Sequence, residues 1–346
     1  MAIADVTVYG AGIFGLSVAW SCAKRGAKVR VIDPNGPGAG SSGGLVGALA
    51  PHVPERWNAK KAFQFDSLIM AETYWAEVEA VSGKSPGYAR SGRLQPIADD
   101  RLLELAKTRA IEAETLWQGE AVWQVRPASD FPDWAPISPT GFLIYDTLTA
   151  RMSPRRAGAS LVAAIQAKGG EIVTDGPSEG TEVWATGWQG MVKLSVELGK
   201  PVGNGVKGQS ALLDYDARDM PQLFADAVHI IPHADGTVAI GSTSERGFDD
   251  PSSCDDALDE VIDRARAVCP ALKDAPVIER WAGVRPRAKS RAPMLGEYPC
   301  RPGVFIANGG FKIGFGMGPR VGELMADLVL EGRDKIPADF RVEASL

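Results

Sequence analysis

The chain has 346 residues, of which 45% are hydrophobic and 23% charged, a composition typical of a globular protein large enough for two domains. Its 37 basic and 43 acidic residues give a net charge of −6, which argues against nucleic acid or an anionic membrane as a partner and favours a small molecule. The 4 cysteines form no CxxC pair and no metal-ligand spacing, so we expect free thiols, no metal and a reducing, cytoplasmic location.

The segment 6–15, VTVYGAGIFG, places Gly10, Gly12 and Gly15 directly after a short apolar run. In a dinucleotide-binding fingerprint the first glycine permits a tight turn, the second lets backbone N–H groups approach a pyrophosphate, and the third lets the next helix pack on the sheet. A second β-rich run ends at Asp33, eighteen residues beyond Gly15, where a carboxylate that binds ribose belongs. The pattern predicts a dinucleotide site, and the fingerprint alone permits NAD, NADP or FAD.

Residues 6–23 carry no charge and are long enough to suggest a transmembrane or signal segment. Asp5 precedes the stretch where a signal peptide would have a cationic region, glycines interrupt it, and Lys24 and Arg25 follow it. We therefore interpret the stretch as strand, turn and helix, and expect no stable membrane insertion.

A glycine-rich loop follows, and after it comes a middle region whose pattern indicates a separate lobe. Residues 36–51 are too rich in glycine for regular structure but are apolar, which indicates a loop that is buried or lies close to a ligand. Apolar residues at helical spacing predict helices over 60–81 and 99–117, and GRLQPI and FLIYD predict strands. A proline-rich passage at 127–139 suits loops.

A helix is predicted over 154–168, followed by strands in EIVTD and TEVWATGW, so that alternation of strand and helix returns. ALLDY, VHIIPH and GTVAIGST predict antiparallel strands, followed by a helix over 255–268. The C-terminal part predicts a strand at GVFIAN, a glycine-rich loop at 309–318 and a helix from Pro319 to Leu330.

These elements predict an α/β protein with a Rossmann-like nucleotide-binding domain assembled from the discontinuous segments 1–50, 146–205 and 292–346. Residues 51–145 and 206–291 would form a second, α+β domain, in which an antiparallel sheet binds the substrate.

Four blocks of sequence resemble, in order and spacing, the FAD-dependent amine oxidoreductases of the D-amino-acid oxidase, glycine oxidase and sarcosine oxidase superfamily. They are VYGAGIFGLS with Asp33, TEVWATGW, WAGVRPRAKSRAPMLGEYP and NGGFKIGFGMGPRVGELMADLVLEG. The likeness is nearest to glycine oxidase and to bacterial D-amino-acid oxidases and dehydrogenases. It implies FAD held noncovalently, because residues 308–318 include no cysteine for the covalent flavin link of monomeric sarcosine oxidases.

The resemblance implies that FAD contacts the first glycine-rich turn, the loop at 41–45, the strand EIVTD, the turn at 185–188 and the loop before the last helix. The implied cofactor-binding residues are Gly10, Gly12, Ile13, Phe14, Gly15, Asp33, Pro34, Ser41, Ser42, Gly44, Leu45, Val173, Ala185, Thr186, Gly187, Trp188, Gly310, Phe311, Lys312, Ile313, Gly314, Phe315 and Gly316. The helix starting near Pro319 would face flavin N1 and C2=O and stabilise the reduced flavin. The alternative for residues 185–187 is an ordinary transition from strand to turn, and the alternative for this loop is a plain glycine-rich turn before a C-terminal helix.

Arg285, in AGVRP, matches the family arginine that holds the substrate carboxylate, a task that suits the planar fork of a guanidinium. The alternative is a solvated strand face, since Arg285, Arg287, Lys289 and Arg291 alternate with other residues. Lys312 stands where glycine oxidase has an arginine. It is a candidate for contact with flavin or with the substrate carboxylate, or for a structural salt bridge.

Two histidines are further catalytic candidates. His229, in VHIIPH, falls where relatives often have an active-site tyrosine, although a histidine in a strand is more often a packing residue. His52 follows a loop that covers the flavin in the family.

The implied reaction is oxidation of an amino acid or secondary amine with a carboxylate: a D-amino acid, glycine or an N-methyl amino acid. Hydride would pass from the α carbon to flavin N5, leaving an imine that hydrolyses to a keto acid, with O2 reduced to H2O2. The alternatives are a dehydrogenase on the same scaffold that uses a quinone or carrier, a noncatalytic FAD-binding subunit of an amine-oxidising complex, and an NAD-dependent dehydrogenase. The oligomeric state stays open.

Overall fold

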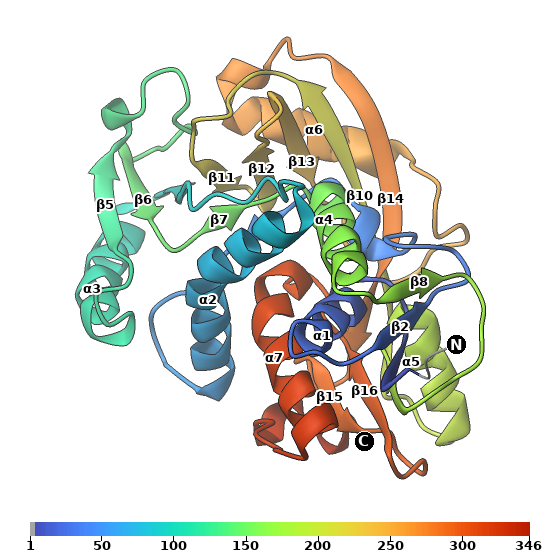
Figure 1. Ribbon diagram of the computed structural model, residues 1–346. Coiled ribbons are helices and arrows are strands. Elements are labelled where there is room, and N and C mark those ends of the chain that lie inside the picture. The colour runs from blue at the N-terminus through green and yellow to red at the C-terminus, as the bar shows by residue number, and fades with distance from the viewer. Residues whose placement is uncertain (1–3) are drawn as a thin grey trace.

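The computed structural model describes residues 4–346 and contains two main β-sheets (Figure 1). The first has the strand order β15-β16-β9-β1-β2-β8. Its members are β1 (Val6–Tyr9), β2 (Val29–Ile32), β8 (Glu171–Val173), β9 (Thr181–Trp184), β15 (Met294–Glu297) and β16 (Val304–Asn308). All neighbours are parallel except β15 and β16, so three distant parts of the chain build one largely parallel sheet, as the sequence predicts.

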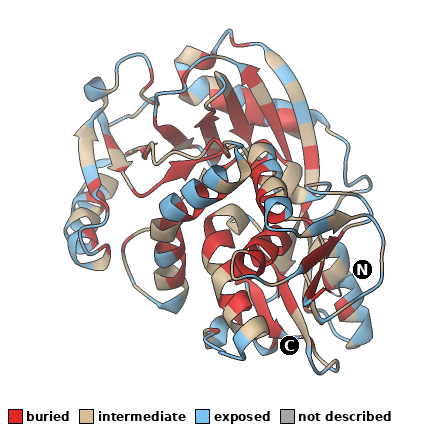
Figure 2. Ribbon diagram, in the orientation of Figure 1, coloured by how far each residue is buried: buried red, intermediate tan, exposed pale blue. Residues whose placement is uncertain are grey.

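Helix α1 (Ile13–Ala23) packs on this sheet beside α4 (Pro154–Ala167) and α7 (Gly314–Glu331), and α2 (Ala59–Ser82) packs on α4 and α7 (Figure 1). Every residue of α1 is buried, and Figure 2 shows it as a continuous red helix. This burial explains the uncharged stretch, because a helix that is covered on all sides has no polar face. Among residues 4–346, no helix is both long enough and apolar enough to cross a bilayer.

The second sheet has the strand order β14-β10-β13-β12-β11-β4-β6-β5, and all its neighbours are antiparallel except β11 and β4. Its strands are β4 (Arg93–Pro96), β5 (Trp123–Pro127), β6 (Phe142–Asp146), β10 (Gly203–Asp214), β11 (Gln222–Ala225), β12 (Val228–Pro232), β13 (Thr237–Gly241) and β14 (Val277–Ala288). A short antiparallel pair, β3 (Ala48–Leu49) and β7 (Ala150–Arg151), is separate from both sheets.

Helices cover the second sheet at both ends. The amphipathic helix α6 (Asp256–Val268) buries Leu258, Val261, Ile262 and Ala265 against β10, β12 and β13. Helix α5 (Gly187–Glu197) packs on β10 and β14, and α3 (Asp100–Leu116) packs on β5. The division into two domains that we infer from the sequence separates the strands of the two sheets almost completely, and its boundaries stay a proposal.

The start of α7 differs from the prediction. The helix begins at Gly314, and Pro319 lies inside it, so half of the expected glycine loop is helical. Glycine has low helix propensity, which is why the sequence reads as a loop. Tertiary packing reverses that preference, because a Cβ on Gly318 would lie 2.9 Å from Ser17 Oγ, and one on Gly322 would lie 2.5 Å from the Ser17 carbonyl oxygen. Helix α5 and the strands β3, β5, β7, β11, β14 and β15 are not among the predicted elements.

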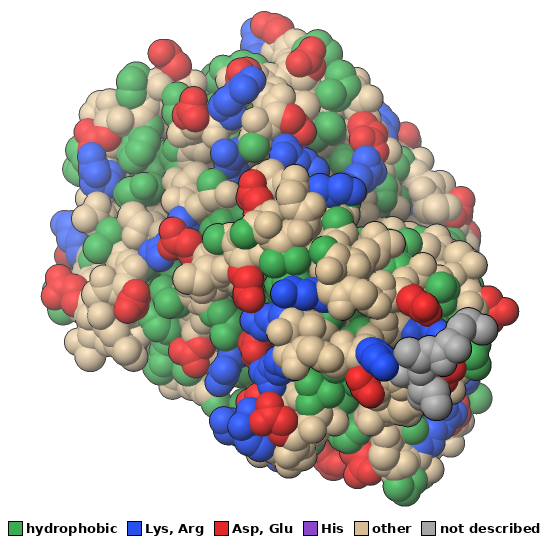
Figure 3. All heavy atoms as spheres, in the orientation of Figure 1, with side chains coloured by type: hydrophobic (Ala, Val, Ile, Leu, Met, Phe, Trp, Pro, Cys, Tyr) green, Lys and Arg blue, Asp and Glu red, His purple; other side chains and the backbone are tan. Residues whose placement is uncertain are grey.

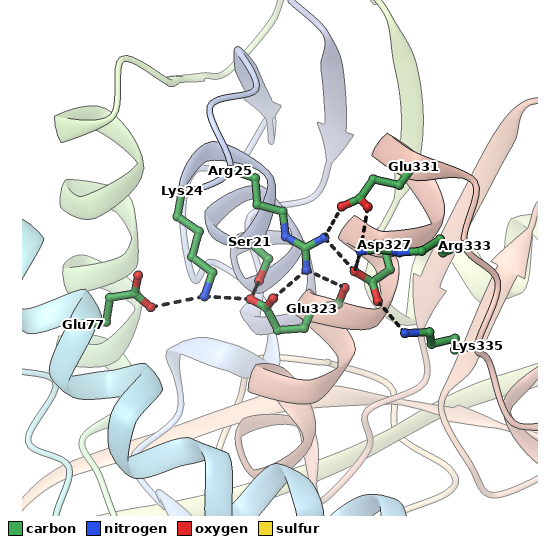
Figure 4. A network of polar contacts seen from close by, with 9 residues as sticks. All are labelled: Ser21, Lys24, Arg25, Glu77, Glu323, Asp327, Glu331, Arg333 and Lys335. Carbon is green, nitrogen blue, oxygen red and sulfur yellow. Dashed lines mark hydrogen bonds and ion pairs between the residues drawn. The ribbon is translucent and has the colours of Figure 1, made fainter.

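A polar network ties the end of α1 to α7 (Figure 4). Arg25 Nη2 lies 2.6 Å from Glu323 Oε2, and Arg25 Nη1 lies 2.7 Å from Asp327 Oδ1. Lys24 Nζ and Ser21 Oγ reach the other oxygen of Glu323 at 2.9 and 2.8 Å. The network holds the two helices whose N-termini flank the candidate site. Elsewhere, acidic and basic side chains are interspersed on the face drawn in Figure 3.

Candidate cofactor and substrate site

A cavity of about 430 Å³ lies where the parallel strands β1, β2, β9 and β16 end. In open α/β sheets, ligands bind outside the carboxyl ends of such strands. Fifteen of the predicted cofactor residues line it: Gly10, Gly12, Ile13, Phe14, Asp33, Pro34, Ser41, Ser42, Ala185, Thr186, Gly187, Trp188, Gly310, Phe311 and Gly314. We call this the dinucleotide cavity.

The three glycines of the first turn have different environments. Gly10 has φ +103°, and a Cβ there would overlap the carbonyl oxygen of Ala185, while a Cβ on Gly15 would overlap the carbonyl oxygen of Gly10. A Cβ on Gly12 would meet a single side-chain atom, Ser42 Oγ, at 3.2 Å. Gly10 and Gly15 are therefore required by the packing of the chain itself, whereas Gly12 keeps the surface beside the cavity free for a ligand.

Polar groups from two other segments surround this turn. Ser42 Oγ accepts a hydrogen bond from the Ile13 N–H at 2.9 Å, at the N-terminus of α1. Asp33 accepts from the Ala11 N–H at 2.8 Å and from the Asn35 N–H at 3.0 Å. A carboxylate has about four acceptor positions, so Asp33 retains capacity for a ribose hydroxyl. The N–H groups of Phe14 and Gly15 complete the positive end of the helix dipole.

The segment after β9 closes the cavity from the opposite side. Thr186 is the N-cap residue of α5, and Gly187 has φ +64°. Asn308, at the end of β16, donates from its side-chain nitrogen to the Gly187 carbonyl oxygen at 2.8 Å. This contact, which sequence reasoning did not identify, joins the middle segment to the C-terminal segment beside the cavity.

Five predicted cofactor residues line neither the dinucleotide cavity nor a second cavity beside the start of α7: Gly15, Gly44, Leu45, Val173 and Phe315. The Leu45 side chain packs with Ile231 and Ala239 in a hydrophobic cluster. The Val173 carbonyl oxygen accepts from the Asp33 N–H at 3.0 Å and so fixes the end of β2. These residues shape the segments around the cavity, and direct cofactor contacts by them stay a prediction.

A second cavity, of about 500 Å³, lies between the second sheet and the start of α7. All four predicted catalytic residues, Arg285, Lys312, His229 and His52, line this substrate cavity, although they come from four different segments. Ile313 and Gly316 of the predicted cofactor set also line it. Residues 310–316 thus contribute to both cavities, which makes this segment a shared wall between them.

Arg285 lies on β14, opposite Val206 of β10, and its side chain is only partly exposed. Its Nη2 donates to Ser242 Oγ at 2.6 Å, and its Nη1 donates to the Thr243 carbonyl oxygen at 3.3 Å. Burial lowers the pKa of the guanidinium to about 10, which leaves it charged at neutral pH. Both acceptors are neutral, so the positive charge faces the cavity without a carboxylate partner among the described residues.

Lys312 is exposed, and within residues 4–346 its ammonium group makes no ion pair. Its Nζ lies 5.8 Å from the centre of the Phe311 ring. Partial burial, followed by the charge of Arg285, lowers the pKa of Lys312. The two cations are close in the backbone as well, because the Phe311 N–H donates to the Pro286 carbonyl oxygen at 3.0 Å.

Both candidate histidines are held neutral. Burial, and then the charges of Arg93, Lys312 and Arg285, lower the pKa of His229 to about 3. Its ring packs on Phe224 with 4.6 Å between centres, and its Nδ1 is buried with no partner in the described chain.

Burial, and then the nearby Lys60 and Lys61, also lower the pKa of His52, whose Nδ1 contacts Gln64 Oε1. Because Gln64 Oε1 can only accept, His52 Nδ1 carries the proton and its Nε2 is an acceptor.

Other lining residues were not assigned from the sequence. The dinucleotide cavity also includes Tyr9, Ile32, Asn35, Ala39, Gly40, Gln189, Val284, Pro286, Ala307 and Asn308. The substrate cavity also includes Val46, Ala48, Ala50, Pro51, Gln64, Arg93, Phe224, Ala227 and Ser242. Most are ordinary strand or loop residues with no local signal, but the residues that follow strand ends could have been found from the rule that ligands bind there.

The dinucleotide cavity fits a dinucleotide cofactor. It runs from the residues after β2, where a ribose would bind, past the N-terminus of α1 to Phe311 and Gly314 at the N-terminus of α7. The first backbone N–H groups of α1 and α7 have no carbonyl acceptor within their own helix, and the absence of a side chain at Gly12 leaves room for a phosphate beside α1.

Comparison with known proteins agrees with this geometry. The sequence model of the FAD dependent oxidoreductase family matches residues 5–328. Glycine oxidase of Pseudomonas putida is 28% identical over 385 residues, which cover 99% of this chain and 99% of the relative. The bifunctional protein ThiO/ThiG of Nostoc sp. is 24% identical over 368 residues, and there the match covers 99% of this chain but 55% of the relative, so the chain spans about half that protein.

Solved structures share the fold. Glycine oxidase from Geobacillus kaustophilus superposes with a TM-score of 0.83 at 20% identity, covering 98% of both chains. Iminodiacetate oxidase from Chelativorans sp. BNC1 superposes with a TM-score of 0.83 at 24% identity, covering 97% of this chain and 98% of the other. Because the family model matches most of this chain, the chain belongs to the FAD-dependent oxidoreductases.

Proposed function

We propose that the protein oxidises an amine that carries a carboxylate, at the carbon next to nitrogen, to an imine that hydrolyses to a keto acid. FAD would accept the two electrons, and O2 would reoxidise it with formation of H2O2. The observation that carries this proposal is Arg285, a partly buried guanidinium that faces the substrate cavity and has neutral protein partners.

Arg285 would bind the substrate carboxylate. Two of its N–H groups hold Ser242 and Thr243, which fixes the plane of the guanidinium, and the remaining donors are free for a ligand. A carboxylate held in this fork is bound by charge-assisted hydrogen bonds and kept in one orientation. The adjoining wall at 310–316 then determines which substrate atoms lie towards the dinucleotide cavity.

The charges around the substrate cavity would also favour the neutral form of the substrate amine. An amine is oxidised in its neutral form, and the positive charges of Arg285 and Lys312 disfavour an ammonium ion nearby. His229 and His52 stay neutral and can accept a hydrogen bond from the amine. Apolar residues such as Val46 and Phe224 line the same space and limit access of water.

We further propose that FAD is bound noncovalently in the dinucleotide cavity by the residues predicted from the sequence. The four cysteines, Cys22, Cys254, Cys269 and Cys300, are free thiols, and none of them lines either cavity. The names of the relatives support the substrate class, since glycine oxidase and iminodiacetate oxidase are both named after amines with a carboxylate.

The test is anaerobic reduction of the bound flavin, followed by its absorbance, with glycine, sarcosine and a set of D-amino acids. At least one of them should bleach the flavin, and readmission of O2 should then yield H2O2. Reduction without peroxide formation, but with rapid transfer to a quinone or dye, would identify a dehydrogenase. Failure of every carboxylate-bearing amine to reduce the flavin would refute the proposal.

The variant Arg285→Ala should raise KM or lower kcat/KM by roughly 100-fold, since hydrogen bonds to a charged group contribute up to about 3 kcal/mol. The flavin content should not change. Arg280→Ala is the matched control, because Arg280 lies on the same strand but pairs with Asp259 at the surface.

A further inference from the structure

Arg93 is a second guanidinium at the substrate cavity, and the proposed reaction does not use it. It lies at the start of β4, is 5% exposed, and lines the cavity together with Arg285. Its Nε donates to Asp146 Oδ2 at 2.9 Å, and Asp146 is fully buried. The two terminal Nη groups of Arg93 have no hydrogen-bond partner within the described part of the chain. A nearly buried side chain therefore presents unpaired donors to a ligand cavity.

The position of Arg93 in the sheet separates it from Arg285. In the strand order β14-β10-β13-β12-β11-β4-β6-β5, Arg285 lies on the edge strand β14, Arg93 on the interior strand β4, and His229 on β12 between them. The positive charges of both guanidinium groups lower the pKa of the His229 imidazole. The substrate cavity thus has a guanidinium at each of two opposite sides, with a neutral histidine in the middle.

The charges on the cavity wall do not balance. Arg93, Arg285 and Lys312 line the cavity, but no carboxylate among residues 4–346 does. The carboxylate of Asp146 compensates the charge of Arg93. Glu245 is the acidic group whose charge acts on Arg285, but its Oε2 lies 3.8 Å from Lys207 Nζ and so already has a cation beside it. A substrate with a single carboxylate bound at Arg285 would leave the charge of Lys312 without a counter-ion and the Nη groups of Arg93 without an acceptor. Donors of a largely buried side chain that find no acceptor are unfavourable.

We propose that the substrate carries a second acidic group, which binds the Nη groups of Arg93 while Arg285 holds the carboxylate next to the reacting carbon. This rests on the proposed function and specifies its substrate class as amines with two acidic groups, such as acidic D-amino acids or N-carboxymethyl amines. A guanidinium suits this task because its two terminal nitrogens can donate in parallel to one carboxylate.

The test compares substrates that differ in one charge. D-glutamate is set against D-glutamine, and iminodiacetate against sarcosine, in wild-type holoenzyme. The acidic member of at least one pair should have the higher kcat/KM, by about 10- to 100-fold, as expected for a hydrogen-bonded charge. Equal values within both pairs, or a preference for the neutral members, would overturn the inference.

The double variant Arg93→Met/Asp146→Asn removes the buried pair together, because loss of Arg93 alone would leave an uncompensated buried carboxylate. It should bring the ratio of kcat/KM between the acidic and the neutral member of a pair from about 10- to 100-fold down to about one, whatever the variant does to the two separate values. Arg93→Lys keeps the charge next to Asp146 but loses the paired Nη groups, and it should show an intermediate preference. An unchanged preference in both variants would overturn the inference.

Binding without turnover separates this inference from the proposed function. Titration of the bound-flavin absorbance with succinate and with succinamate, which has one carboxylate replaced by an amide, should give a Kd for succinate at least about tenfold lower. If no amine reduces the flavin but this difference exists and disappears in the double variant, the proposed function fails while the second anion site stands. If amines reduce the flavin but succinate and succinamate bind equally, the proposed function stands and the second anion site is refuted.

Discussion

The guanidinium of Arg285 lies so close to Gly208 that a Cβ on Gly208 would overlap both of its Nη atoms. Gly208 is on β10, diagonal to Arg285 across the pair of strands β10 and β14. The glycine thus provides the space in which the proposed carboxylate-binding group lies, although it lines neither cavity itself.

Gly208→Ala should therefore weaken substrate binding through Arg285. The new methyl group pushes the end of a flexible side chain away from Ser242 and Thr243, so the fold should survive while kcat/KM falls by about tenfold or more. Steady-state kinetics and thermal unfolding measure the two effects. Gly158→Ala is the control, because a Cβ there meets nothing within 4 Å, and its kinetics should equal those of the wild type. Wild-type kinetics in Gly208→Ala would argue against Arg285 as the carboxylate ligand.

Gly12→Ala and Gly10→Ala should have different consequences. Gly12→Ala should fold normally and bind FAD weakly, because its Cβ meets only Ser42 Oγ but points to the space where a phosphate would lie. Gly10→Ala should reduce stability itself, because its Cβ overlaps the Ala185 backbone and its φ is positive. Flavin content after purification and unfolding of the FAD-free protein distinguish them. Full flavin retention in Gly12→Ala would place the pyrophosphate elsewhere.

His229 should make the stability of the FAD-free protein depend on pH. Its pKa is about 3 in the folded state and about 6.5 in an unfolded chain, so the unfolded state alone binds a proton between these values. The contribution of the neutral imidazole is fully present above about pH 6.5, and the free energy of unfolding falls as the pH decreases below it. Denaturant unfolding of His229→Gln should show a shallower fall between roughly pH 6.5 and 4.5. Parallel curves for variant and wild type would show that His229 is solvated.

The network between α1 and α7 should respond to acid in the same direction through a different group (Figure 4). Burial opposes the charge of Glu323, but hydrogen bonds from Arg25, Lys24 and Ser21 outweigh it and lower the pKa of the carboxyl group. The stabilisation is complete above the ordinary carboxyl pKa and is lost as the pH falls through the lowered one.

Glu323→Gln should accordingly lower the free energy of unfolding by about 2 kcal/mol at neutral pH, and the difference from wild type should shrink in acid. Glu104→Gln is the control, because Glu104 pairs with Lys107 at the surface and both side chains are more than half exposed. A loss of the same size in both variants would mean that the network between α1 and α7 stabilises the protein no more than a surface ion pair does.

Several parts of the fold and site could be predicted because their signals are local. Gly10, Gly12 and Gly15 follow a short apolar strand, and the turn that they make depends on backbone freedom within a few residues. The helices α2, α3, α4 and α6 show helical periodicity and lie close to their predicted bounds. Arg285, Lys312, His229 and His52 were found by resemblance, and the structure brings all four to one cavity.

Other features have no local signal. Gly314–Pro319 has the composition of a loop, and it becomes the first turns of α7 because Gly318 and Gly322 let that helix approach α1. Arg93 is an ordinary basic residue in a short strand until the sheet places it across the cavity from Arg285. Gly208 is one of 39 glycines until β14 lies beside it.

The sequence by itself determined the dinucleotide turn, the alternation of strands and helices and the resemblance to flavin-dependent amine oxidoreductases, because each depends on residue order over short spans. Only the tertiary structure decided which charges share a cavity, which glycine makes room for which side chain and which arginine keeps free donors. Those properties depend on contacts between residues that are far apart in the chain, such as Arg93 with Asp146 and Arg285 with Gly208. Burial of these residues determines how strongly a polar contact contributes to stability or binding.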